Sequence, residues 1–344
     1  MIDVARATVR ARSRTGRHVL VLAAGLVVLL AVAALSIGTG SGDVTFAEAW
    51  HLLWAGDGGY EATVVHSMRV PRTVLGVVAG ASLAVAGALM QTLTRNPLAD
   101  PGIFGVNAGA AACVVAVISL FGVEAFTGYV WFGLLGAAVA SAVTFVLGAR
   151  AGTGAAPLRL ALAGTAVSAA LTAFTNAFVY FDAASFAQYR SWIVGTLSVP
   201  NATVVWQVVP FAVVGLLGAL LLAAPLNALA LGEDAGTALG SKPGRTRLLG
   251  VLAVVVLCGA TTAAAGPIAF VGLTVPHMVR AVTGPDHRLL LPYSIVFAPT
   301  LVLLADIVGR VLLPGGEIEV AIMCALFGGP VFVLIARRRR LGGL

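Results

Sequence analysis

Ten apolar runs, most of them about 20 residues long, follow one another along this chain of 344 residues. A helix needs about 20 apolar residues to cross the hydrocarbon core of a bilayer, so these runs predict transmembrane helices. The chain is 59% hydrophobic and 10% charged, and a soluble domain of this length could not keep so many apolar side chains off its surface. We therefore expect an all-α polytopic membrane protein, with a single transmembrane domain over residues 1–344. The expected spans are 19–38, 71–93, 103–122, 129–149, 158–180, 203–224, 246–265, 267–282, 289–312 and 318–337.

The seventh and eighth runs allow an alternative assignment. Gly266 and Pro267 interrupt one continuous apolar stretch, and the eighth run is short for a crossing. A single kinked helix at this point would reverse the orientation of everything that follows it.

The N-terminus also allows two interpretations. Residues 1–18 carry five arginines before the first apolar run, as in a secretory signal peptide. The apolar run 19–37 is longer than the core of a signal peptide and long enough to span, which favours a retained first helix.

Positive charge is distributed unevenly over the loops between the runs. With the N-terminus inside, 17 of the 21 Lys and Arg residues fall on the cytoplasmic side, as expected of membrane proteins. We therefore expect a multi-pass cell-membrane protein in which both termini, the basic segment 1–18 and the loop 225–247 are cytoplasmic. The four outer exceptions are Arg69, Arg72, Arg190 and Arg310. The tryptophans support this topology, because all five fall at the outer interface: Trp50, Trp54, Trp131, Trp192 and Trp206.

Small residues recur within the spans, as in Gly76-x-x-x-Gly80 and Gly87 of the second run. Such residues let neighbouring backbones approach closely in lipid, so we interpret them as helix-packing positions. The segment between the fifth and sixth runs is too polar to span, and its string Trp192–Leu197 is expected to form a short helix at the outer face.

Motifs for ATP hydrolysis, proteolysis and metal binding are missing from the sequence. There is no Gly-x-x-x-x-Gly-Lys-Ser/Thr loop, no His-Glu-x-x-His and no Cys/His cluster, so we expect no catalytic residue, metal site or cofactor in this chain. Asp306 does lie inside a span, with Arg310 one helical turn later, and this spacing favours a local ion pair over a proton relay.

Several longer strings occur in an order that resembles the FecCD-type permeases, the membrane subunits of ATP-binding-cassette importers for iron-siderophores, haem and cobalamin. The resemblance implies that the chain pairs with a second permease (a copy or a paralogue), two ATPase subunits that bind ATP, and an external substrate-binding protein. It further implies alternating-access transport of a metal-chelate, with an iron-siderophore favoured. The strings are Arg69–Thr73, Gly87–Gln91, Asn96–Pro101, Trp192–Leu197, Leu226–Gly232, Gly266–His277, Asp286–Arg288 and Ala305–Arg310.

The family resemblance assigns roles to three groups of residues. Arginines at the first and last of these strings would dock carboxylates of the binding protein, although they could instead anchor helix ends or pair with Asp306 and Glu61. The loop 225–247 would couple to the ATPases, although it could be an ordinary basic loop; within it, residues 233–240 read as a short helix ended by a glycine. The inner gate would lie where the fourth run turns into the fifth, at a proline that could equally be a first-turn residue. These residues are Arg69, Arg72 and Arg310 for docking, Leu231, Gly232, Glu233, Asp234, Leu239 and Gly240 for coupling, and Ala156, Pro157 and Leu158 for the gate.

Two other classes of function remain as alternatives. An ion-coupled secondary transporter would need ionisable groups inside the membrane, and those are scarce here. An intramembrane enzyme would need clustered polar residues facing one cavity, and the sequence shows no such cluster.

Overall fold

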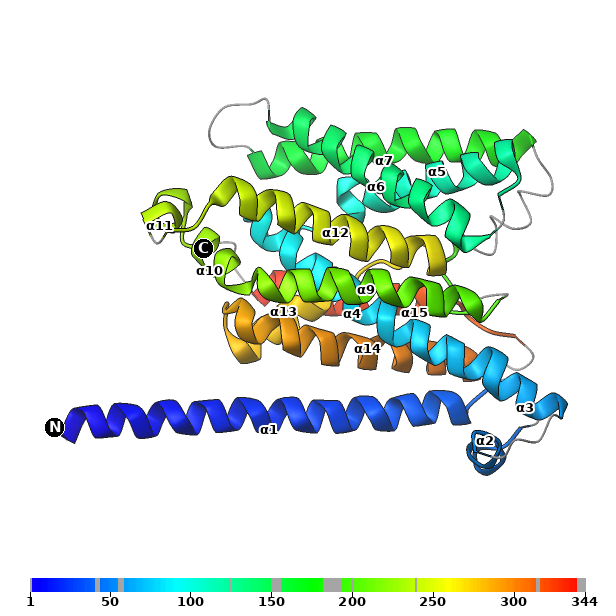
Figure 1. Cartoon of the computed structure of the whole chain (residues 1–344), viewed down its shortest axis with the longest axis horizontal. Coiled ribbons are helices and arrows are strands. Elements are labelled where there is room, and N and C mark those ends of the chain that lie inside the picture. The colour runs from blue at the N-terminus through cyan, green and yellow to red at the C-terminus, as the bar shows by residue number, and fades with distance from the viewer. Residues whose placement is uncertain are drawn as a thin grey trace.

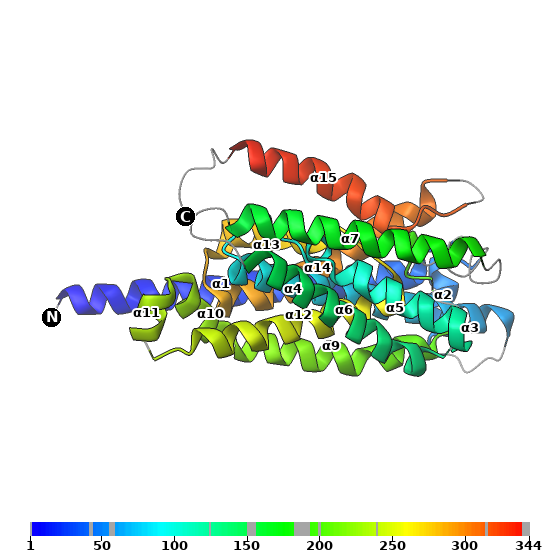
Figure 2. The ribbon, with the colours of Figure 1, turned by 90° about the horizontal axis from the view of Figure 1, so that it is seen from above.

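In the computed structural model the described residues form helices packed side by side along one long axis (Figure 1; Figure 2). It describes residues 2–40, 44–54, 59–123, 125–149, 156–181, 193–198, 201–238, 240–313 and 316–338. Each of the ten segments predicted to span contains a helix, although the eighth, 267–282, becomes helical only from Val271. The elements are α1 (Ile2–Gly38), α2 (Phe46–Leu52), α3 (Tyr60–Val64), the π-helix η1 (Val65–Arg69), α4 (Val70–Leu93), the 3-10 helix η2 (Pro101–Phe104), α5 (Val106–Phe121), α6 (Phe126–Ala149), α7 (Ala156–Phe181), α9 (Thr203–Leu221), α10 (Ala223–Ala230), α11 (Glu233–Ala238), α12 (Pro243–Ala265), α13 (Val271–Thr283), α14 (His287–Val311) and α15 (Val320–Arg338).

Seven helices within the described residues are long and apolar enough to cross a membrane. The helix α5 and the apolar part of α15, Val320–Leu334, are shorter, and α13 has only 13 residues. Of the long helices, α4, α12 and α14 are mostly buried by their neighbours, whereas α1, α7 and α9 leave most of their surface open. In a membrane this open apolar surface faces lipid or another subunit, so the composition and the architecture agree.

The chain reverses direction between α12 and α13. The intervening residues 266–270 are not helical, and Gly266 and Phe270 both have a positive φ, of 72° and 67°. The helix α12 starts beside α11, and α13 returns to the same end, where the next turn places Asp286 against Asn227 of α10. The two-helix interpretation is therefore confirmed, and the single kinked helix is wrong.

The two ends of the bundle differ in the elements that they carry (Figure 1). The α11 end holds α10, α11 and the start of α12. The start of α1 and the end of α15 lie at this end too. The α2 end holds α2, α3 and the start of α4. Four tryptophans of the predicted outer side are exposed in the structure, while Trp192 lies outside the described residues.

Of the string expected to form a short helix at the outer face, Ile193 is helical, residues 194–197 are not, and Trp192 lies outside the described residues. Instead this segment is inserted beside the break between α12 and α13: the Thr196 amide donates to the Ala265 carbonyl at 2.8 Å, and Leu197 is fully buried. The Ala321 amide, at the start of α15, donates to the Gly195 carbonyl at 3.2 Å. The unpaired backbone groups at the end of α12 and the start of α15 explain this placement, because they need partners inside the bundle.

Glycines allow the central helices to touch backbone to backbone. A Cβ on Gly87 of α4 would lie 1.9 Å from the carbonyl oxygen of Gly272 in α13, and one on Gly80 would lie 2.7 Å from the backbone of Pro299 in α14. The helices α5 and α6 meet in the same way at Gly109. The packing role predicted for the small residues of α4 is confirmed.

Candidate functional site

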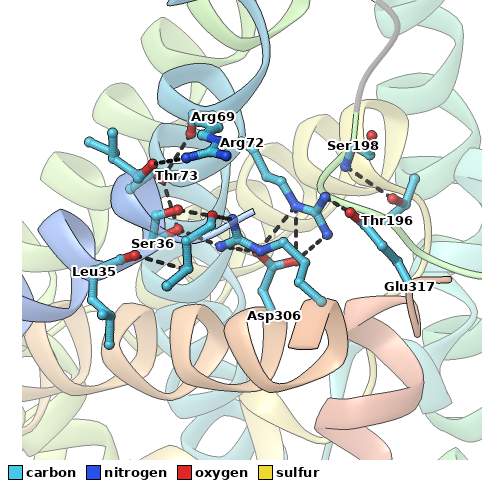
Figure 3. A network of polar contacts seen from close by, with 12 residues as sticks. Leu35, Ser36, Arg69, Arg72, Thr73, Thr196, Ser198, Asp306 and Glu317 are labelled. Carbon is cyan, nitrogen blue, oxygen red and sulfur yellow. Dashed lines mark hydrogen bonds and ion pairs between the residues drawn. The ribbon is translucent and has the colours of Figure 1, made fainter. Parts of the chain in front are cut away.

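Five charged residues meet at the α2 end of the bundle, and we call them the arginine cluster (Figure 3). They come from the end of η1, the start of α4, the end of α14 and the turn before α15. Three arginines and two carboxylates give the cluster a formal charge of +1. The members are Arg69, Arg72, Asp306, Arg310 and Glu317.

Asp306 is the centre of the arginine cluster and is fully buried. The Nε of Arg72 lies 3.1 Å from each carboxylate oxygen of Asp306, and its Nη2 lies 2.8 Å from Oδ1. On the other side, Nη2 of Arg310 lies 2.9 Å from Oδ2. The remaining Nη1 of Arg72 donates to Glu317 at 2.7 Å. One buried carboxylate is thus shared by two guanidinium groups, an arrangement that offsets the cost of removing these charges from water.

Arg69 and Arg310 also cap the C-terminus of α1. The last four carbonyls of a helix have no partner within it, and here α1 ends inside the protein. Arg310 donates to the Ser36 carbonyl at 2.9 Å, and Arg69 donates to the carbonyls of Ile37 and Gly38, both at 3.2 Å. The Leu35 carbonyl accepts from the Thr39 amide at 2.9 Å. All four carbonyls are therefore satisfied, and the positive charges lie at the negative end of the helix dipole.

The three arginines predicted to dock a partner lie together at the expected end of the chain, but they are not free on its surface. The exposed fractions of Arg69, Arg72 and Arg310 are only 5%, 8% and 4%, because each guanidinium is held by groups of the same chain. The predicted ion pair between Asp306 and Arg310 is confirmed. The second carboxylate in the cluster is Glu317, whereas the sequence had suggested Glu61.

The residues predicted to couple to ATPases lie in and beside α11. Leu231 is 68% exposed, and Gly232 has a φ of 115° between α10 and α11. The predicted short helix is confirmed as α11, which begins with Glu233 and Asp234, and Gly240 follows it with a φ of 79°. This positive φ ends the helix as expected, with the Ser241 amide returning to the Gly236 carbonyl at 3.0 Å. Leu239 lies outside the described residues.

A second polar cluster, which we call the α10 junction, joins α10 to α14 and α4. The Nδ2 of Asn227 donates to Asp286 at 2.6 Å, and its Oδ1 accepts from the His287 amide at 2.9 Å. His287 reaches on to the Thr92 hydroxyl, 2.6 Å from Nε2. The members of the junction are Thr92, Asn227, Asp286 and His287.

Asp286 is also the N-cap of α14, where it accepts the Arg288 amide at 2.9 Å. Partial burial opposes its negative charge, but the hydrogen bonds from the Arg288 amide and Asn227, together with neighbouring positive charge, outweigh it, so the pKa of Asp286 lies below its usual value. The carboxylate is therefore ionised at neutral pH and keeps its capping role.

The residues predicted as an inner gate lie at the start of α7, which begins at Ala156 and has Pro157 and Leu158 in its first turn. Only the backbone of these three residues is described, so their side chains carry no structural argument. Their role stays a prediction.

Sequence reasoning found both strings that form the α10 junction, Leu226–Gly232 and Asp286–Arg288, but not the contact between them. Asn227 and Asp286 are 59 positions apart, and nothing in the periodicity of either segment relates the two. The only indication of this contact in the sequence was the type of the residues. An Asn and an Asp-His pair beside apolar helices are polar groups that need partners.

A profile of the FecCD transport family matches residues 26–338. The chain belongs to the FecCD transport family. Its relatives include the ferric enterobactin transport system permease protein FepD of Escherichia coli strain K12, 45% identical over 82% of this chain and 84% of FepD. The probable siderophore transport system permease protein YfiZ of Bacillus subtilis strain 168 is 36% identical over 93% of this chain and 96% of YfiZ.

A solved structure of an ABC transporter of the metal-chelate type, in an inward-facing conformation, superposes on this FecCD chain with a TM-score of 0.78. The two are 27% identical, and the match covers 93% of this chain and 99% of the other. The chain is thus the permease subunit of an ABC importer, and it is not itself an enzyme. ATP is bound by its ATPase partners. The alternatives of an ion-coupled transporter and an intramembrane enzyme are excluded by this membership.

Proposed function

We propose that this FecCD permease moves a ferric siderophore across the cell membrane by alternating access. The observation that carries the proposal is the 45% identity to a relative named for ferric enterobactin, over most of both chains. A second relative is also named for siderophore transport. Haem and cobalamin are the alternative cargoes within the family resemblance.

The test is uptake by the reconstituted complex. The chain is purified with the subunits that accompany it and placed in vesicles, with the binding protein supplied on the outside. We expect radioactive iron to enter when it is presented as a siderophore complex together with ATP, and unlabelled haem or cobalamin not to compete. ATP-dependent entry of haem or cobalamin with no entry of the siderophore would overturn the cargo assignment.

We further propose that two permease chains, copies or paralogues, assemble with two ATPase subunits at the α11 end. The binding protein would then dock at the α2 end. The charge of the loops supports this orientation, with both termini on the cytoplasmic side. An inner gate at residues 156–158 is part of the same proposal.

The orientation predicts the outcome of cysteine labelling. Lys242 is exposed at the α11 end and Tyr60 is exposed at the α2 end. In intact cells a membrane-impermeant thiol reagent should modify Tyr60→Cys but not Lys242→Cys, and permeabilised cells should show both reactions. Equal reaction of the two variants in intact cells would contradict the proposed topology.

The coupling role predicts a loss of ATPase binding when the exposed apolar side chain beside α11 is made charged. Burying a leucine against a partner contributes about 1.5–3 kcal/mol, so Leu231→Asp should weaken ATPase association by about 10- to 100-fold in a titration of detergent-solubilised permease. The matched control is Leu313→Asp, a half-exposed leucine near the α2 end, which should leave the association unchanged. If the two variants weaken ATPase association equally, residues 225–247 form an ordinary basic loop with no coupling role.

Docking of the binding protein by the arginine cluster also stays a proposal. Arg69 is the informative residue, because its guanidinium donates to backbone carbonyls, whereas charge reversal at Arg72 or Arg310 would disturb the buried ion pairs. The variant Arg69→Gln keeps donors for the carbonyls but removes the charge. If the charge steers docking, association should slow most at low salt.

A further inference from the structure

The helix α10 is fixed to the bundle both by buried leucines and by a hydrogen-bonded asparagine. Its residues Leu226 and Leu229 are buried, and between them Asn227 uses both ends of its amide toward the start of α14. The neighbouring helix α11 packs mainly against α10. A force applied to α11 therefore reaches the rest of the bundle largely through α10.

Asn227 is not needed to cap α14. Asp286 already accepts the Arg288 amide in the N-cap position. Asn227 adds a bond to the Asp286 carboxylate and two bonds from His287, one from the amide at 2.9 Å and one from Nδ1 at 2.8 Å. With the ring proton on Nδ1, Nε2 of His287 accepts from the Thr92 hydroxyl of α4 at 2.6 Å; the Ala88 carbonyl, 3.0 Å from the same hydroxyl, competes for this one proton. The side chain thus ties α10 to two helices at once.

Those two helices are joined along their whole length. At the α11 end Thr92 of α4 meets His287 of α14, and at the α2 end Arg72 of α4 meets Asp306 of α14. Between these points the backbones are in close contact at Gly80, which faces Pro299. The two fastening points lie 20 residues apart on α4 and 19 residues apart on α14, a separation of roughly 30 Å along the helices.

We propose that Asn227 is a positioning residue that transmits movement of α10 and α11 to the α4–α14 pair, and through it to the arginine cluster at the opposite end. The proposal rests on the coupling role proposed above for α11. As a positioning residue, Asn227 acts without touching the ATPases or the cargo. It makes the α10 junction stiff, so that displacement of α11 moves α4 and α14 together instead of being absorbed by bending at α10.

The experiment compares transport with ATP hydrolysis in vesicles that contain the complete complex and its binding protein loaded with a ferric siderophore. Asn227→Ala should retain the ATPase subunits and hydrolyse ATP within twofold of the wild type, but it should move at least about fivefold fewer siderophores per ATP. Thr92→Val, which removes the hydroxyl at nearly constant volume, should show the same loss, and Thr92→Ser should restore the ratio. The matched control is Thr246→Val, because the Thr246 hydroxyl at the same end bonds within its own helix turn, to the Lys242 carbonyl at 3.2 Å, and to no other helix in the described part of the chain.

The possible results distinguish the positioning role of Asn227 from the coupling role proposed for α11. A wild-type chain that binds no ATPase would show that the coupling role itself is wrong, and the inference would fall with it. If the wild type is coupled and Asn227→Ala moves as many siderophores per ATP, Asn227 does not position α10. Loss of the ATPases from Asn227→Ala would make the residue part of the docking surface, and this too would overturn the inference. Should Asn227→Ala fail to fold, an unchanged ratio in Thr92→Val would overturn it by itself.

Discussion

Replacing Asp306 with alanine is expected to lower the free energy of unfolding by about 3–5 kcal/mol, the cost typical of removing one partner from a buried ion pair. Asp306 is fully buried and is the carboxylate that Arg72 and Arg310 share. Without it, the acceptors left to the two guanidinium groups among the described residues are Glu317 and neutral groups such as the Ser36 carbonyl. Reversible unfolding in mixed detergent micelles measures the change.

The matched control for Asp306→Ala is Glu317→Ala at the edge of the same cluster. The Glu317 side chain is 29% exposed, and its pair with Arg72 is open to screening by solvent, so we expect a loss of about 0–1 kcal/mol. The isosteric Asp306→Asn should fall between the two, because it keeps an acceptor but not the charge. Equal losses for Asp306→Ala and Glu317→Ala would show that burial does not determine the strength of this cluster.

Replacing Gly87 with alanine is expected to prevent stable assembly of the bundle. The added Cβ would lie 1.9 Å from the Gly272 carbonyl oxygen and 2.4 Å from its carbon, and backbone atoms cannot move aside as a side-chain end can. Overpacking of a core ordinarily costs about 1–3 kcal/mol, and here separation of α4 from α13 would add to that. The yield of monodisperse permease after detergent extraction measures the effect.

Gly218 of α9 provides the control for Gly87, because a Cβ there meets nothing within 4 Å. Gly218→Ala should leave the yield unchanged and stabilise the chain by about 0.5–1 kcal/mol, since alanine favours a helix over glycine. A normal yield from Gly87→Ala would mean that α4 and α13 do not lie as close together as the structure places them.

The arginine cluster shows where sequence reasoning is strong and where it fails. The pair of Asp306 and Arg310 was predicted, because residues four positions apart on one helix face the same way. The pair of Arg72 and Asp306 joins positions 234 apart, and a local pattern contains no information about such a contact. The alternative that these arginines anchor helix ends is seen at the C-terminus of α1, whose carbonyls need donors and are brought to Arg69 and Arg310 only by packing.

The sequence by itself determined the membrane-spanning helices, the place where α11 ends and the break after α12, although only the structure decided that the chain turns back at this break. Each of these depends on a local property: the length of an apolar run measured against the bilayer, or the backbone freedom of a glycine such as Gly240 or Gly266. The tertiary structure alone decided which polar groups meet, at the arginine cluster and at the α10 junction. Inside a bundle every buried polar group must find a partner, but the nearest one is set by how helices far apart in the chain pack together, and that packing is a property of the whole fold.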